Sequence, residues 1–233
     1  MQKSDQTKLN IYNSLVSLAV SSREGEVSVT DVSQESGVSR RTFYYHFDDI
    51  ADTATWGFFY DLSQSLTLYS KTDSSIALVY PDNDADGKYR ELPYYVRKTP
   101  GVRTIDGSDF FKALHGAVRK HGPFYSVMTP TESGRQFLGR LASLYLPQIC
   151  FDIRFIAGGR PMKQRVVEML ASDFVQTRIV SCFNPNTDHP FSYPSDEKGL
   201  ENIAHDYLKL EVNEYLKANS PRYVIKDLRK DVW

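Results

Sequence analysis

Apolar residues recur at helical spacing over most of the chain, which predicts a mainly helical protein. Between residues 7 and 23, Ile11, Leu15 and Leu18 fall on one stripe, as expected for a helix with one buried face. Gly25 follows this stretch, and glycine commonly ends helices. We therefore expect a first amphipathic helix over residues 7–23.

Three further helices are predicted before residue 70. Thr30 and Ser39 each precede a short stretch of helical periodicity, and both residue types are favoured N-caps. The helix capped by Thr30 is expected to end at Gly37, and the helix capped by Ser39 at about His46. A longer helix begins at Asp48 or Asp49 and carries four spaced apolar positions, Trp56, Phe59, Leu62 and Leu66.

The pattern changes over residues 70–107, which contain three prolines and three glycines. Within them IALVYP and YRELPYYV are typical of strands. Helical periodicity returns afterwards and predicts helices over residues 108–121, the first capped by Ser108 and stopped by Gly122-Pro123, and then over 132–146, 163–183 and 196–218. We expect an all-α fold with a three-helix N-terminal domain, 1–50, and a larger helical domain, 51–233, interrupted by a non-helical segment near 70–107.

Composition narrows the class of protein. Hydrophobic residues make up 41% of the chain, as in a globular protein, and no apolar run reaches the roughly 18 residues of a membrane span. The N-terminus lacks the layout of a secretory signal. Cys150 and Cys182 are expected to be reduced, so we expect a cytoplasmic protein. The net charge of −1 gives no sign of nucleic-acid binding, which must be argued from local arrangement.

Residues 29–47, VTDVSQESGVSRRTFYYHF, have the layout of a helix-turn-helix, whose second helix enters the major groove of DNA. Gly37 supplies the backbone freedom of the turn, and Val32, Val38 and Phe43 are placed to form a small core. The outer surface is left to Ser39, Arg40, Arg41, Thr42, Tyr44, Tyr45 and His46. Arginine can grip guanine with two hydrogen bonds, and tyrosine, histidine and serine can bind phosphate oxygens.

This segment resembles the signature of the TetR family of bacterial regulators. The matching parts are its Val-Thr-Asp-Val start, the Gly-Val-Ser turn and the run Thr-Phe-Tyr-Tyr-His-Phe, and the match covers about residues 8–60. The resemblance implies a repressor of transcription that binds operator DNA and is released by a small-molecule effector. Carried over by position, the expected phosphate contacts are Thr30, Tyr45 and His46, and the residues facing bases or the adjoining backbone are Arg40, Arg41 and Tyr44.

The chain departs from the family in its charges. The family usually places a lysine or arginine at the start of the fourth helix, where this chain has Asp48-Asp49-Ile50-Ala51. Five basic and five acidic residues balance through Phe47. We expect DNA binding with a shallow salt dependence, and a lysine at position 50 is expected to add a phosphate contact. The alternative is that Ile50 packs inward.

Two expectations concern the larger domain. Wide apolar stripes on residues 163–183 and 196–218 predict a homodimer, whose symmetry would match a palindromic operator. An effector is expected in an aromatic cavity lined by Phe110, Phe111, Phe137, Tyr145 and Phe174. The alternative, that these five form ordinary core, stays open.

Other chemistry is weakly indicated. Residues 82–87, DNDADG, match the start of a calcium loop, but its twelfth position is Pro93 instead of glutamate. None of the five histidines has metal-ligand spacing, and no catalytic signature is present, so neither an enzyme nor a cofactor is expected. Two alternatives remain: a similar fold without operator binding, acting on small molecules or proteins, and a regulator that docks a partner through residues 70–107.

Overall fold

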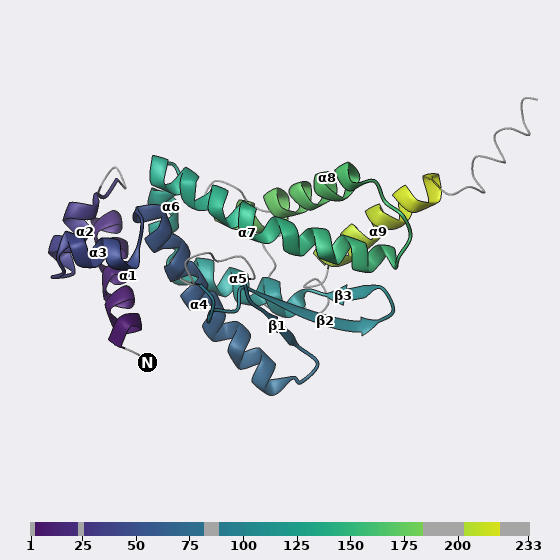
Figure 1. Cartoon of the computed structure of the whole chain (residues 1–233), viewed down its shortest axis with the longest axis horizontal. Helices are drawn as coiled ribbons and strands as arrows, with labels where there is room; N and C mark the ends of the chain where they lie inside the picture. Colours follow the sequence, from purple (N-terminus) through teal and green to yellow (C-terminus); the bar gives the residue numbers. More distant parts are fainter. Residues whose placement is uncertain (1–2, 23–25, 82–88, 184–202, 220–233) are drawn as a thin grey trace, which may run out of the picture.

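The computed structural model describes residues 3–22, 26–81, 89–183 and 203–219. These are mainly helical, with one small antiparallel sheet, which confirms the predicted fold class. Figure 1 shows α1, α2 and α3 gathered at one end of the molecule, while the sheet, α8 and α9 lie toward the other.

The N-terminal helices are α1 (Lys3–Ser21), α2 (Val29–Glu35), α3 (Arg40–His46) and α4 (Ile50–Thr72). Ser39 is the N-cap of α3, as predicted, and Asp49, one of the two residues at which the next helix was expected to begin, is the N-cap of α4. The prediction for α2 was wrong, because its N-cap is Ser28 and not Thr30. Ser28 and Asp31 bond each other's backbone N–H groups in a capping box, which places Thr30 inside the first turn.

The sheet consists of β1 (Ala77–Val79), β2 (Tyr95–Gly101) and β3 (Thr104–Asp106), in the order β1-β2-β3. The second strand was predicted over residues 89–96 but begins six residues later. The N–H of Leu92 bonds the carbonyl of Tyr89 in a turn, and Pro93 has no N–H to donate to a ladder. The calcium-loop-like residues 82–87 lie outside the described residues.

The larger body contains α5 (Ser108–Lys120), α6 (Gly122–Met128), α7 (Glu132–Ala157), α8 (Gln164–Phe174) and α9 (Ile203–Ala218). After α8 the chain continues as a π-helix, Val175–Ile179, and a 3-10 helix, Val180–Phe183. Residues 163–183 are therefore helical, as predicted. Of the helix predicted over 196–218, the residues before 203 lie outside the described part of the chain.

Three details of the body differ from the sequence prediction. Ser108 is the first residue of α5 and does not cap it, because the N-cap is Gly107. Gly122-Pro123 stops α5 but also begins α6, since proline is well tolerated in a first helical turn. α7 does not end at residue 146. It continues through Pro147 to Ala157, because the buried stripe also continues, through Ile149, Ile153 and Ile156.

Helix α4 connects the two ends of the molecule. It packs against α1 on one side and against α5 and α7 on the other, and most of its residues are buried. The ring of Tyr12 in α1 lies directly over Gly57 of α4, at a distance that leaves no room for a side chain there. The orientation of the first three helices thus depends on how they seat on α4.

Candidate nucleic-acid interface

The turn between α2 and α3 has the predicted geometry. Gly37 adopts φ +66°, in the left-handed region that favours glycine. The N–H of Val38 bonds the carbonyl of Ser33 at 3.0 Å and closes the turn. Val32 and Phe43 are fully buried, and Val38 packs against the same core. These contacts hold α3 across α2, in the arrangement of a helix-turn-helix.

One face of α3 is open to solvent. Arg40 and Arg41 are exposed, as are Tyr44, with 51% of its surface accessible, and Tyr45, with 82%. The pairs 40/44 and 41/45 are four residues apart, so the four side chains share a face of the helix. The two arginines present guanidinium donors on this exposed face, and the two tyrosines beside them present hydroxyl groups.

The other predicted contacts are placed differently. Thr30 is exposed on α2. The hydroxyl of Ser39 accepts the N–H of Thr42 at 3.0 Å and lies 2.8 Å from the Thr42 hydroxyl. Ser39 is exposed and Thr42 half-buried. Both hydroxyls therefore stabilise the start of α3 before they can take part in any contact with DNA.

The prediction that His46 lies on the outer surface was wrong. Only 7% of its surface is accessible, and its ring packs edge-on against Tyr45, with 4.9 Å between centroids. It lies three residues after Phe43, on the buried side of the helix. Burial, and secondarily the charge of Lys8, lowers the pKa of His46. The imidazole is thus a neutral part of the core, and α3 offers four exposed residues of the type expected.

The start of α4 follows α3 closely. It pairs with a residue of α7 that sequence analysis missed. Ile50 is buried, with 6% of its surface accessible, so the inward-packing alternative is correct. Arg140 of α7 donates to both carboxylate oxygens of Asp49, at 2.8 and 2.6 Å. A basic residue therefore does stand at the start of α4, but it comes from 91 positions further along the chain. No local pattern could have signalled this pairing.

The five aromatic residues predicted to line an effector cavity are all buried in packed core. Phe110 lies 5.6 Å from Tyr145 and 5.1 Å from Phe111, and Phe111 lies 6.2 Å from Phe174, measured between ring centroids. Phe137 stacks on Tyr125 at 5.8 Å. Rings at these separations fill the space between them. The structure therefore favours the alternative, in which these residues are ordinary core.

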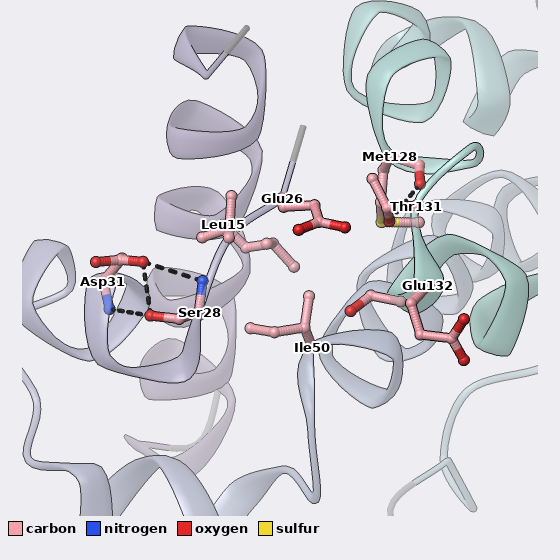
Figure 2. Close-up of a pocket in the computed structure, with 10 residues that line it drawn as sticks. Leu15, Glu26, Ser28, Asp31, Ile50, Met128, Thr131 and Glu132 are labelled. Carbon is pink, nitrogen blue, oxygen red and sulfur yellow. Dashed lines mark hydrogen bonds between the residues drawn. The ribbon is translucent and has the colours of Figure 1, made fainter. Parts of the chain in front are cut away.

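A cleft of about 350 Å³ lies elsewhere, between the N-terminal helices and the α6–α7 turn. Figure 2 shows Ser28 on one wall and Glu132 on the other, with Ile50 between them. Its walls combine apolar groups with the carboxylates of Glu26, Asp31 and Glu132. Asp31 is bonded by Ser28, and Glu132 by Arg135. A molecule in this cleft would touch both the N-terminal helices and the α6–α7 turn of the larger body.

Among the helices of the described residues, none combines the length and the apolar character that a membrane crossing requires. Residues 3–22, 26–81, 89–183 and 203–219 also contain no group of three or more metal-ligating side chains suitably placed for an ion.

No protein-family model matches the chain, and no curated protein matches it either. Inference about function therefore starts from the geometry of α2, α3 and α4.

Proposed function

We propose that this protein is a sequence-specific, DNA-binding regulator of transcription that docks α3 in the major groove. The observation that carries the proposal is the division of α3 into two faces. Phe43 and His46 face the core, while Arg40, Arg41, Tyr44 and Tyr45 are exposed. Exposed arginine suits guanine edges, and tyrosine hydroxyls suit phosphate oxygens. The resemblance of residues 29–47 to the TetR signature supports the same proposal.

The proposal includes a homodimer formed through α8 and α9. Met169 on α8 and Tyr207 and Leu210 on α9 are large apolar side chains that are at least half exposed. A two-fold dimer presents two α3 helices to a palindromic site. Sedimentation at micromolar concentration should give a dimer, and a monomer would contradict this part of the proposal.

The proposal also includes repression relieved by a small molecule, as the TetR resemblance implies. The cleft between Ser28 and Glu132 supports it better than the aromatic core does, because it is open and is lined by both the N-terminal helices and the α6–α7 turn of the larger body. A ligand shifts an equilibrium only when it binds one conformation better than the other. A cleft whose two walls belong to different parts of the molecule would change shape if those parts moved relative to each other, and this would give a ligand its preference.

Selection of bound duplexes from a random-sequence library tests the function. The protein should enrich a palindromic site, and Tyr44→Ala should bind that site about 10-fold more weakly, as for a typical lost contact of about 1–3 kcal/mol. Tyr80→Ala is the matched control, because Tyr80 is also exposed but lies far from α3 in the sequence, after β1. No enrichment by a folded protein would refute the function and favour a fold that acts on small molecules or proteins.

The salt dependence of binding tests the electrostatic side. Arg40 and Arg41 are the two basic residues on the exposed face of α3. Each phosphate neutralised contributes about −0.9 to the slope of log affinity against log salt. A dimer using these two arginines in each copy should show a slope of roughly −4, and a slope near −10 would require phosphate contacts outside α3.

A further inference from the structure

Residues 48–52 connect α3 to the body, and we call this segment the joint. A bidentate ion pair holds it against α7. Asp49 is the N-cap of α4 and follows α3 by only three residues. Arg140 lies in α7, and its two terminal nitrogens donate to the two oxygens of Asp49. About a third of each side chain is accessible to solvent, 34% for Arg140 and 39% for Asp49. A fork of this kind fixes orientation as well as distance.

Hydrogen bonds within residues 48–52, and one from Tyr89, also stabilise the joint. One oxygen of Asp49 accepts the N–H of Asp52 at 2.7 Å. Asp52 is itself buried, accepts the N–H of Asp48 at 2.9 Å, and is bonded by the hydroxyl of Tyr89. Residues 48–52 are therefore connected to α7 through Arg140 and to the chain before β2 through Tyr89.

The joint contains three acidic residues, and Arg140 supplies a positive charge beside them. Asp48, Asp49 and Asp52 lie within five residues at the end of the interface that faces the body. Burial is the largest single influence on the pKa of Asp49 and acts to raise it, but the hydrogen bonds and charge of Arg140, together with the backbone N–H groups of Asp52 and Ala51, leave the pKa below its ordinary value. Asp49 is therefore ionised at neutral pH, and its charge is balanced by Arg140.

A second attachment of the N-terminal helices to the body is made by an aromatic ring and is less directional. Tyr12 of α1 meets His121 and Phe124 edge-on, with ring centroids 5.5 and 6.2 Å away. Aromatic pairs are favourable over a range of centroid separations, about 4.5–7 Å. The two parallel N–H···O bonds of an arginine–carboxylate fork require a narrower geometry. Of these two contacts, the fork is the one that defines an angle.

We propose that Arg140 is a positioning residue: its fork with Asp49 sets the angle of α3 to the body and thereby the operator half-site spacing that the dimer accepts. This inference rests on the proposed function. In a two-fold dimer, the distance between the two α3 helices depends on how each joins its own body. Half-sites on one face of DNA lie about 34–36 Å apart, so a small change of angle at each joint alters which spacing fits.

The test compares Arg140→Met with Arg135→Met. Arg135 lies in the same helix and also loses an ion pair, but its partner Glu132 is on α7 itself and both side chains are well exposed. The selected operator and versions with one base pair added or removed between half-sites are titrated with each folded variant. Arg140→Met should bind the selected operator at least 10-fold more weakly and discriminate less between spacings. Arg135→Met should behave like the natural protein.

Two results separate positioning from simple charge. If the loss in Arg140→Met disappears at high salt while the spacing preference is kept, uncompensated repulsion from Asp49 explains it and the inference is overturned. Arg140→Lys keeps the charge but not the fork, so it should show a relaxed spacing preference with a smaller loss of affinity. A lysine variant with the natural spacing preference also overturns the inference.

Amide hydrogen exchange provides a readout that needs no DNA. The amides of residues 48–52 should exchange at least 10-fold faster in Arg140→Met than in Arg135→Met. Equal exchange in the two variants would overturn the inference that the fork holds this segment. If the natural protein enriches no DNA sequence, the proposed function fails and the spacing role fails with it. Normal operator binding by Arg140→Met, in contrast, overturns the inference alone.

Discussion

Replacing Gly57 by alanine tests the seating of α1 on α4. A Cβ at position 57 would stand 2.1, 2.2 and 2.4 Å from three ring atoms of Tyr12. Ordinary carbon contacts begin near 3.4 Å, so the ring or the helix must move by about 1.3 Å. Tyr12 is fully buried and meets Phe124 and His121 edge-on. The ring therefore has no free space in which to retreat.

Two effects of opposite sign decide how much Gly57→Ala changes the free energy of unfolding. Alanine is preferred over glycine inside a helix by about 1 kcal/mol. Overpacking of a filled core typically costs about 1–3 kcal/mol. At Gly57 we expect the second effect to win and the free energy of unfolding to fall by about 1–2 kcal/mol.

Gly139 provides the matched control. It lies inside α7, is exposed, and a Cβ there would meet nothing within 4 Å. Gly139→Ala should therefore stabilise the protein by about 0.5–1 kcal/mol. Urea unfolding of the two variants should place them about 1.5–3 kcal/mol apart on opposite sides of the natural protein.

A double-mutant cycle identifies the cause. In a Tyr12→Ala background the obstructing ring is gone, so Gly57→Ala should become neutral or stabilising. If Gly57→Ala is as stable as Gly139→Ala, or if its cost is the same with and without the ring, the close approach of α1 and α4 at this point is refuted.

Two further predictions concern the interface. The pKa of His46 is lowered in the folded protein, mainly by burial, so acid favours the unfolded state: stability is full above about pH 6.5 and falls as the pH drops below it. His46→Gln should remove that part of the loss in urea unfolding between pH 7.5 and 5.5, and an unchanged profile would contradict the burial. Ile50→Lys should lower stability by about 2 kcal/mol and give no gain in DNA affinity, because the side chain faces the cleft. Stronger binding by a folded variant would show that the side chain reaches DNA.

Local chemistry was sufficient to predict the elements that depend on neighbouring residues. The N-caps Ser39 and Asp49 and the turn at Gly37 require only a hydroxyl, a carboxylate or a missing Cβ at the correct position. The same reasoning predicted Thr30 as the N-cap of α2, although Ser28 fits an N-cap equally well and is the residue that caps the helix. Recognising Asp31 three residues after Ser28, as in a capping box, would have separated them.

Element ends were predicted less well where the tertiary core compensates for a local signal. Pro147 suggests a helix end near residue 146, yet α7 continues to Ala157. The lost hydrogen bond at the proline is offset by burial of the apolar stripe that follows it.

By itself, the sequence determined the helical class, the helix-turn-helix and the exposed face of α3, because these follow from periodicity and from contacts a few residues apart. Only the tertiary structure decided the burial of His46 and Ile50, the packing of the aromatic residues as core, and the pairing of Asp49 with Arg140. Each of these depends on which distant segment covers a given surface. Which segment covers a surface is decided by close packing over the whole chain, and the neighbouring residues in the sequence do not indicate it.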